Sequence, residues 1–336
     1  MTGSQDIVAV ENLVVVYSDG TKAVDDISFH VKEGEFFGFL GPNGAGKSTT
    51  IKALTTLLHK TSGRVSVAGY DLDASPGEIR KAIGAMSQET TVDVDLTGRE
   101  NVRLQGRLEQ MHGAALRDRV EELLKVVQLD DVAGKEAGRY SGGMKKRLDL
   151  ASALVHKPKL LFLDEPTTGL DVQSRTAIWD YLEKLNKEEG VTIFLTTQNM
   201  EEADRLCRRV SIIDNGKIIA EGSPSELKES IGGDTITVSF KEDTDPLVKS
   251  RAKAILGAVP GVTGVIDSDH SVVAYTKSAS QVVIDVVTAL GRDNIRPSSL
   301  AISSPTLDDV FLRKTGRRIR SEPLTRKVTE PSVITS

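Results

Sequence analysis

Residues 41–49, GPNGAGKST, place the strongest constraint on the fold, because they match the pattern G-x-x-x-x-G-K-[ST]. The apolar run FFGFL precedes them, and TTIKALTTLL, which has the pattern of a helix, follows. Glycines in such a loop let backbone N–H groups surround an anion, and the start of the next helix adds its dipole. We therefore expect a strand–loop–helix unit that binds a nucleoside triphosphate. The alternative is a glycine-rich turn without a ligand, which the strand–loop–helix context disfavours.

Within this loop, lysine and hydroxyl groups have separate expected tasks. Lys47 is expected to reach the terminal phosphates, and the Ser48 hydroxyl to bind Mg²⁺. The residues of the loop expected to contact the nucleotide are Gly41, Asn43, Gly44, Ala45, Gly46, Lys47, Ser48 and Thr49.

A second apolar run, LLFL at 160–163, ends in two acids, Asp164 and Glu165, followed by Pro166. A strand with this ending places both carboxylates at its C-terminal tip, where open α/β sheets bind ligands. Asp164 suits Mg²⁺ through water, and Glu165 suits a water molecule that it holds and deprotonates. An acidic turn at a strand end is the alternative, and the phosphate loop predicted on the same sheet argues against it.

A third motif, YSGGM at 140–144, overlaps the start of residues 142–156, in which apolar residues recur with the spacing of one face of a helix. Ser141 is a good N-cap, and Gly142 and Gly143 leave backbone N–H groups bare, so this helix start predicts a second anion pocket. A capped helix without a ligand explains the same residues equally well.

Composition excludes several classes of protein. The 336 residues carry 43 Lys and Arg against 48 Asp and Glu, a formal net charge of −5, so we expect no nucleic-acid partner. The single cysteine, Cys207, excludes an internal disulfide framework, and the five histidines show no metal-ligand spacing. No apolar stretch approaches the roughly 18 residues that span a bilayer, and the N-terminus does not read as a secretion signal.

The order of apolar and helical segments indicates an α/β fold. Short apolar runs at 13–17, 36–40, 160–163, 191–195 and 210–213 suit the strands of a parallel sheet covered on both faces. Residues 89–157 contain no convincing strand and are read as a helical insertion. Segments 235–240, 246–259, 262–269, 271–278, 278–291 and 295–303 read as β, α, β, β, α and β, the pattern of a small ferredoxin-like domain.

The combination of Tyr17, GPNGAGKST, Gln88, YSGGM, LLFLDEP and GLD (169–171), in this order, resembles the ATP-binding subunit of an ABC transporter. The resemblance implies a P-loop ABC-type nucleotide-binding domain over residues 6–230, with a mainly parallel core sheet, an antiparallel β subdomain and the helical insertion. We expect an accessory βαββαβ domain over 234–316 to follow, and then a disordered tail over 317–336. The fold class is therefore α/β with a small α+β C-terminal domain.

The resemblance also implies roles for single residues. Tyr17 would stack on adenine, Gln88 would touch Mg²⁺ and the attacking water, and Asp171 would join two sites across a dimer. Ser141, Gly142 and Gly143 would face the γ-phosphate held by a partner's phosphate loop, so that two chains enclose two ATP molecules. The alternatives are a packed aromatic for Tyr17, a solvated loop residue for Gln88 and an ordinary helix cap for Asp171.

Two departures from the family pattern stand out. Tyr140 and Met144 replace the more usual Leu and Gln beside the signature serine and glycines, which leaves the expected phosphate contact intact. Gln198 occupies the place of the usual switch histidine, and glutamine can donate a hydrogen bond but cannot carry a proton. We interpret Gln198 as keeping the positioning role, through a hydrogen bond that it donates to the γ-phosphate, while Glu165 alone serves as the base. The alternative is a loop residue without a catalytic part.

The C-terminal string SSPTLDDVFLRKTGRR (303–318), with the accessory domain and Gln198, resembles the ATP-binding subunits of daunorubicin/doxorubicin-resistance exporters. The resemblance implies a cytoplasmic ATPase with ATP and Mg²⁺ as cofactors, a homodimer that forms with ATP, and peripheral attachment to the membrane through a separate permease. It would energise transport of a drug-like or hydrophobic compound. The alternatives are a non-transport ABC ATPase of translation or DNA repair, and a weakly hydrolysing regulator. The accessory domain is interpreted as dimer support. The basic residues Arg313, Lys314, Arg317, Arg318 and Arg320 read as a solvated tail or as contacts to anionic lipid headgroups.

Overall fold

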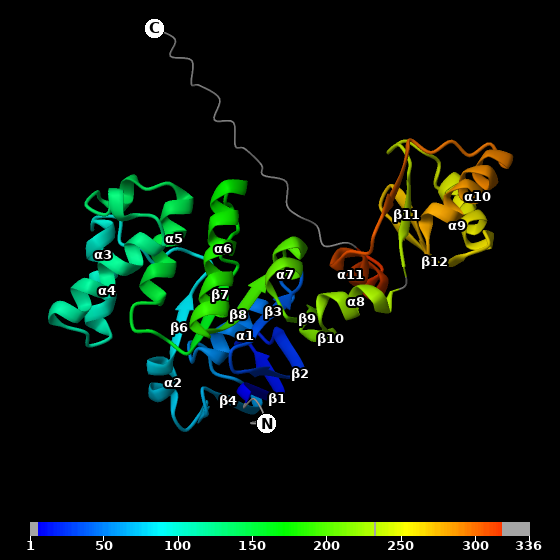
Figure 1. The fold of residues 1–336 in the computed structure, drawn as a ribbon. Helices are drawn as coiled ribbons and strands as arrows, with labels where there is room; N and C mark the ends of the chain where they lie inside the picture. Colours follow the sequence, from blue (N-terminus) through cyan, green and yellow to red (C-terminus); the bar gives the residue numbers. More distant parts are fainter. Residues whose placement is uncertain (1–5, 232, 318–336) are drawn as a thin grey trace, which may run out of the picture.

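The computed structural model describes residues 6–231 and 233–317 (Figure 1). Its central sheet has six strands in the order β10-β9-β3-β8-β7-β6. The five strands from β9 to β6 pair in parallel, and only the β9–β10 hairpin is antiparallel. The strands of this sheet are β3 Phe36–Leu40, β6 Ile83–Met86, β7 Leu160–Asp164, β8 Thr192–Thr197, β9 Arg209–Asp214 and β10 Lys217–Gly222.

Helices and a second sheet cover both faces of the central sheet, which explains why its strands are apolar without alternation. Every residue of β3, β7 and β8 is buried. Along β7, Phe162 packs toward the second sheet, whereas Leu161 and Leu163 belong to the core on the helical side. The helices associated with this part of the chain are α1 Lys47–Leu54, α2 Pro76–Ala82, α6 Val172–Glu189, α7 Met200–Leu206 and α8 Pro224–Ser230.

The second sheet is antiparallel, with strand order β2-β1-β4-β5. It contains β1 Asp6–Val16, β2 Lys22–Lys32, β4 Ser62–Val67 and β5 Tyr70–Asp71. The apolar run at 13–17 belongs to this sheet, so its placement in the parallel sheet was wrong. Burial alternates along parts of β1, and Leu13 and Val15 are buried while Asn12 has a φ of +51° at a break in the strand register. A five-residue window does not show that longer, interrupted pattern.

The insertion predicted for residues 89–157 is helical throughout its regular structure. It contains α3 Gly98–Leu108, α4 Gly113–Val126, two 3-10 turns at Asp130–Val132 and Ala137–Arg139, and α5 Gly142–Ala153. Figure 1 shows these helices together at one end of the molecule, with the central sheet between them and the C-terminal elements. Among the described residues, no helix is both long enough and apolar enough to cross a membrane.

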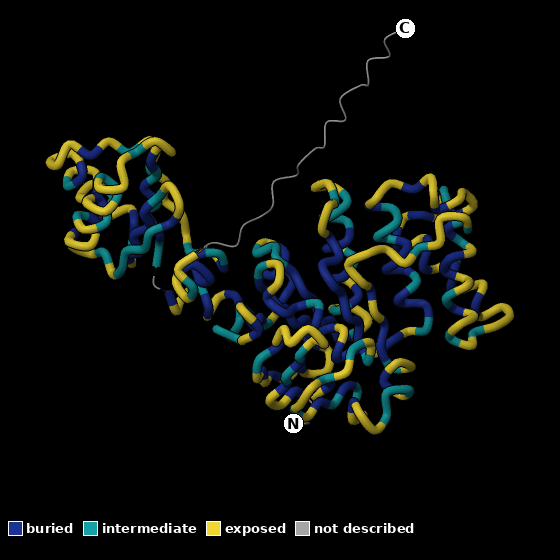
Figure 2. Tube along the Cα trace, turned by 180° about the vertical axis from the view of Figure 1, so that it is seen from behind, coloured by how far each residue is buried: buried dark blue, intermediate teal, exposed yellow. Residues whose placement is uncertain are grey.

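The C-terminal elements form the predicted βαββαβ unit. They are β11 Thr235–Ser239, α9 Pro246–Ala258, β12 Val262–Ser268, β13 Ser271–Thr276, α10 Ala279–Arg292 and β14 Ser299–Ser303. The sheet order is β12-β13-β11-β14 with antiparallel pairs throughout, which is the ferredoxin-like arrangement. One face packs on α9 and α10 through Ile236, Val238 and Val272, and this small core appears as the dark blue centre of the smaller unit in Figure 2.

A last helix, α11 Leu307–Thr315, connects this unit to the part of the chain that contains the central sheet. Phe311 and Leu312 share a core with Leu227 and Ile231 of the α8 region and with Tyr275 of β13. Arg313 donates to the Ile231 carbonyl and lies over the Tyr275 ring.

Arg313 and Arg317 are exposed to solvent, as expected, but they are not part of a disordered tail: Arg313 belongs to α11, and Arg317 pairs with Asp214 at 2.6 Å. Both residues find partners that only the tertiary fold brings within reach. Arg318, Arg320 and the rest of the predicted disordered tail lie outside the described residues.

Candidate functional site

The phosphate loop connects β3 to α1 and needs glycine at both of its ends. Gly46 is the N-cap of α1 with a φ of +105°, and a Cβ there would lie 2.4 Å from the Ala23 carbonyl oxygen. A Cβ at Gly41 would lie 2.3 Å from the Ile213 carbonyl oxygen. The loop can pass this close to two neighbouring backbones only because Gly41 and Gly46 have no side chains. The fold therefore requires glycine at both positions for steric reasons.

Lys47 connects the loop to the acidic end of β7. Its ammonium donates to the carbonyl oxygens of Gly41 at 2.8 Å and Pro42 at 3.0 Å, and lies 3.1 Å from Glu165 Oε1. The exposed fractions of the Lys47 and Glu165 side chains are 4% and 3%. A buried cation is thus placed at the loop with its charge compensated by the acid that follows the strand.

Asp164 joins the hydroxyl groups of two other elements. Its Oδ1 accepts from Ser48 Oγ at 3.1 Å and from Thr196 Oγ1 at 2.5 Å. Carboxylate and hydroxyl oxygens are the ligands that Mg²⁺ takes in proteins, together with substrate phosphates, so this donor set fits that ion. In the described ranges no group of three or more His, Cys, Asp or Glu residues could hold a metal, so an ion here would depend on hydroxyl and phosphate oxygens as well.

Glu165 stands in the left-handed region with a φ of +49°. Its Oε2 accepts from Thr168 Oγ1 at 3.0 Å and from Gln198 Nε2 at 3.3 Å. A non-glycine residue persists in this region only when its surroundings hold it there. Glu165 is therefore a carboxylate fixed by three side chains from three parts of the chain, counting Lys47.

Gln198 lies between β8 and α7 and is half-buried. While its amide nitrogen donates to Glu165, its Oε1 is buried without a hydrogen-bond partner in the described structure. A buried acceptor without a partner costs stability, so such an atom commonly marks a functional contact. The structure thus places Gln198 against Glu165, a contact that the sequence did not predict.

Lys47, Ser48 and Glu165 border a cavity of about 520 Å³. From the phosphate loop and α1, the sequence-predicted residues that line it are Asn43, Gly44, Gly46, Lys47, Ser48 and Thr49. From elsewhere in the chain they are Tyr17, Gln88 and Glu165. The Tyr17 hydroxyl lies 3.0 Å from Thr49 Oγ1, and Tyr17 is 37% exposed, so its side chain is held at the hydroxyl end and is still accessible from the cavity.

Four other predicted residues support the cavity without lining it. Asp164 and Gln198 hold Ser48 and Glu165 as described above. Gly41 accepts from Lys47, and Ala45 accepts from the Gly216 backbone N–H at 3.0 Å.

Sequence reasoning missed a second wall of the cavity, formed by the start of β2 and the β9–β10 turn. Its residues are Thr21, Lys22, Ala23, Asn215 and Gly216. The pair Asn-Gly is a strong signal for a tight hairpin turn, and both residues have positive φ. Nothing in that signal says that the turn lies against the phosphate loop.

The motif Ser141-Gly142-Gly143 does not line this cavity. Ser141 caps α5 and accepts from the Met144 N–H at 3.3 Å. A Cβ at Gly143 would lie 2.8 Å from Ser174 Oγ, and Ser174 in turn donates from its N–H and hydroxyl to Asp171 at 2.9 and 2.7 Å. These bonds hold the pKa of Asp171 below its ordinary value. Asp171 is thus the N-cap of α6, and its neighbour Ser174 packs against Gly143 at the start of α5.

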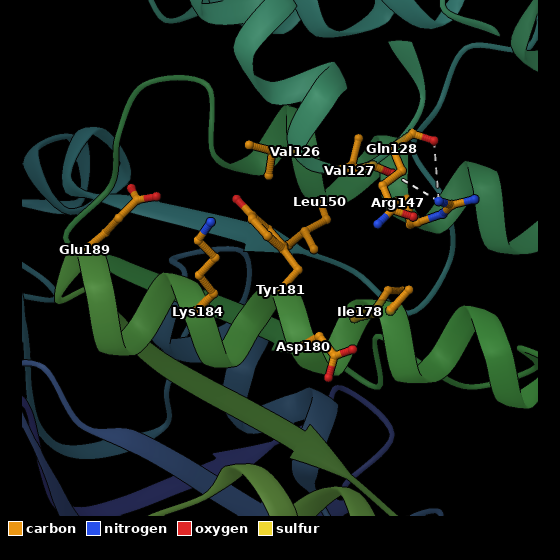
Figure 3. Close-up of a pocket in the computed structure, with 11 residues that line it drawn as sticks. Val126, Val127, Gln128, Arg147, Leu150, Ile178, Asp180, Tyr181, Lys184 and Glu189 are labelled. Atoms are coloured by element: carbon orange, nitrogen blue, oxygen red, sulfur yellow. Dashed lines mark hydrogen bonds between the residues drawn. The ribbon is translucent and has the colours of Figure 1, made fainter. Parts of the chain in front are cut away.

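A separate cavity of about 340 Å³ lies between the insertion and α6 (Figure 3). Tyr181 and Lys184 of α6 face Leu150 and Arg147 of α5 across it. Arg147 donates to the Val127 carbonyl oxygen at 3.1 Å, and burial raises the pKa of Tyr181. No residue that the sequence singled out lines this cavity.

Comparison with protein families gives two matches that divide the chain. A model described as ABC transporter matches residues 24–168, and one described as the C-terminal domain of DrrA1-3-like ATP-binding proteins matches residues 222–315.

Several curated proteins are similar over nearly the whole chain. The daunorubicin/doxorubicin resistance ATP-binding protein DrrA of Streptomyces peucetius is 40% identical over 309 residues, which is 92% of each chain. The Nod factor export ATP-binding protein I of Neorhizobium galegae is 39% identical, over 92% of this chain and 85% of its own.

Solved structures show the same fold. A dimeric ATP-binding cassette in a post-hydrolysis state, bound to ADP and Pi, is 29% identical with a TM-score of 0.60, and covers 64% of this chain and 98% of its own. Together, the geometry of the phosphate loop, the acidic strand end and these similarities establish that the chain belongs to the ABC transporter family as an ATPase of the daunorubicin/doxorubicin resistance ATP-binding type.

Proposed function

We propose that this chain is the ATP-hydrolysing subunit of an exporter, and that it energises movement of a drug-like or hydrophobic compound through a separate membrane permease. The observation that carries the ATPase part is the convergence of Lys47, Asp164, Glu165 and Gln198, from three segments of the chain, on one phosphate loop. Similar proteins named for daunorubicin, linearmycin and Nod factor handling support the exporter class.

Nucleotide binding begins with the cavity. Tyr17 presents a partly exposed ring held at its hydroxyl, which suits stacking on adenine. Backbone N–H groups of the loop and the Lys47 ammonium would bind the phosphates. To do so, Lys47 would give up its contact with Glu165 for a contact with phosphate oxygens.

Ser48, Asp164 and Gln88 are the residues that would hold Mg²⁺, because Ser48 and Gln88 line the cavity and Asp164 accepts from the Ser48 hydroxyl. When bound, the ion neutralises charge on the phosphate oxygens.

Glu165 is the base of the proposed reaction. Once Lys47 has turned to the phosphates, the Glu165 carboxylate is free to accept a proton from a water molecule that attacks the γ-phosphate. Gln198 donates to one oxygen of Glu165, and its own unpartnered Oε1 offers an acceptor to the same water.

A second copy would complete each site. Ser141 to Gly143 lie outside the cavity of their own chain, although their helix start offers free N–H groups to an anion. Two chains arranged head-to-tail would bring that helix start to the partner's γ-phosphate, and Asp171 to the junction between the two sites. Loss of the γ-phosphate removes the shared contact, so hydrolysis would reopen the pair.

The permease would hold the chain at the inner face of the membrane. Closure of the two copies would reach it through the insertion, near Gln88 and α3, because this segment joins the cavity to the helices at the end of the molecule (Figure 1).

The test is the Glu165→Gln variant. We expect it to bind ATP, to form a stable dimer by light scattering, and to release phosphate at least about a hundredfold more slowly than the wild type. A variant that stays monomeric with ATP would contradict the two-chain site. Export is tested separately by co-purification with a multi-span partner that restores transport of a labelled hydrophobic compound in vesicles.

A further inference from the structure

A buried carboxyl group outside the cavity connects α6 and α7 to the loop after β7, which carries Glu165. Glu202, on α7, is 1% exposed. Its Oε1 accepts from Thr167 Oγ1 at 2.8 Å and from Trp179 Nε1 at 2.8 Å. Thr167 belongs to the loop after β7, and Trp179 belongs to α6, so one oxygen atom joins two segments to a third.

We propose that Glu202 is a positioning residue for hydrolysis: through Thr167 it fixes the loop that carries Glu165 against α6 and α7. The proposal rests on the proposed role of Glu165 as the base.

The path from Glu202 to the base is short. Thr167 is followed by Thr168, whose hydroxyl donates to Glu165 Oε2 at 3.0 Å and whose N–H donates to the Glu165 carbonyl at 3.3 Å. Two adjacent threonines therefore connect the two carboxyl groups: Thr167 is hydrogen-bonded to Glu202, and Thr168 to Glu165. The left-handed backbone of Glu165 requires such an outside restraint.

The same anchor lies beside Gln198. Asn199 caps α7, and its Oδ1 accepts from the N–H groups of Glu201 and Glu202 at 3.0 and 3.4 Å. Because Gln198 immediately precedes this cap, α7 fixes the approach of Gln198 to Glu165 while Glu202 fixes the approach of the loop.

Stability alone does not explain a carboxyl group at this place. Glutamate is almost never fully buried without a paired charge, and no cation of the described residues pairs with Glu202. Burial raises its pKa above the ordinary value, and the charge of Glu165 adds to the rise. An apolar side chain of similar volume would avoid that cost. The presence of a carboxyl group therefore indicates that its hydrogen bonds are needed to hold Thr167 and Trp179 in position.

The experiment compares substitutions that keep or remove the acceptor. Glu202→Gln retains Oε1 and should keep kcat within about twofold of the wild type, whereas Glu202→Leu removes the acceptor and should lower kcat about tenfold or more. Because the cavity is not touched, KM for ATP should stay within about twofold.

Variants on the donor side keep the test valid if Glu202→Leu fails to fold. Thr167→Val removes only the hydroxyl and should lower kcat severalfold at unchanged KM, and Thr167→Val combined with Glu202→Leu should be no slower than Glu202→Leu alone. Thr235→Val is the matched control, because Thr235 is a buried, hydrogen-bonded threonine of the accessory unit.

Three outcomes would overturn the proposal: Thr167→Val at wild-type kcat, Glu202→Gln as slow as Glu202→Leu, or a loss that appears in KM instead of kcat. Failure of Glu165→Gln to slow hydrolysis would instead remove the base itself, so the two proposals fail by different variants.

Discussion

The ammonium of Lys47 lies 3.1 Å from a carboxylate oxygen of Glu165, and both side chains are at least 96% buried. Two charges taken out of water in this way depend on each other, because removal of one leaves the other uncompensated. The pair also joins the residue that would bind phosphate to the residue that would activate water. Under the proposed function, this single ionic contact would therefore link nucleotide binding to readiness for hydrolysis.

Replacing Lys47 by Met should therefore affect both stability and activity. We expect phosphate release to be lost, and the free energy of unfolding to fall by about 3 kcal/mol because Glu165 remains buried without its cation. Denaturant unfolding followed by fluorescence measures the second effect. The double variant Lys47→Met with Glu165→Gln should regain most of the lost stability and none of the activity. Equal stability of the single and double variants would show that the pair does not compensate its charges.

Tyr17 gives a prediction about affinity. Tyr17→Ala should raise KM for ATP about tenfold with little change in kcat, since one base–aromatic stacking contact contributes about 1–3 kcal/mol. Tyr17→Phe keeps the ring and loses only the contact with Thr49, so its KM should stay close to that of the wild type. Tyr70→Ala, at an exposed tyrosine of β5, is the control. A similar KM for Tyr17→Ala and the wild type would exclude adenine stacking.

Gln198 should contribute to kcat. Gln198→Ala removes the donor to Glu165 and the adjacent acceptor, and we expect steady-state phosphate release to fall about tenfold, the effect of roughly 1.4 kcal/mol. Gln281→Ala, at an exposed glutamine of α10, should leave the rate unchanged. Activity of Gln198→Ala equal to that of the wild type would remove Gln198 from the site.

Local sequence patterns were sufficient for the parts of the site that lie on a single segment. The glycines of the phosphate loop, Lys47 and Ser48 form one continuous motif, and Asp164 with Glu165 ends one apolar strand. The central strands were also predictable, because burial on both faces removes the alternation that a half-exposed strand shows.

Contacts between distant segments were beyond those patterns. Thr167 and Glu202 are ordinary polar residues in sequence, and only packing of α7 on the loop after β7 brings them together. The Asn215-Gly216 turn is recognisable as a turn, but its place beside Ala45 depends on the pairing of β9 with β3. Likewise, Arg313 reads as one charge of a basic run until α11 places it over Tyr275.

If Ser141 at the start of α5 acts in the partner's site, two inactive variants should complement each other when they are mixed. In a head-to-tail dimer, Lys47→Met and Ser141→Arg are inactive by themselves, but a mixed dimer has one site with an intact Lys47 and an intact Ser141 from the other copy. Equal mixing should restore roughly a quarter of wild-type phosphate release, because half of the dimers are mixed and each has one working site. Mixing Lys47→Met with Glu165→Gln is the control, since these defects lie in the same half-site and each mixed site keeps one of them. No recovery in the first mixture would contradict a site shared between chains.

The raised pKa of Glu202 leads to a prediction of how the free energy of unfolding depends on pH. Its folded pKa lies above the ordinary value of 4.5 for a glutamate because of burial, so the folded state binds more protons than the unfolded state between 4.5 and the folded pKa. Stability from this group is therefore fully present below 4.5 and is lost as pH rises through the folded pKa. Glu202→Gln has no proton to lose, and its Oε1 keeps both hydrogen bonds. The free energy of unfolding of Glu202→Gln minus that of the wild type should consequently grow as pH rises from 4.5 toward neutrality. Denaturant titrations of both proteins at a series of pH values measure this difference, and a constant difference across the series would mean that Glu202 is ionised in the folded protein throughout.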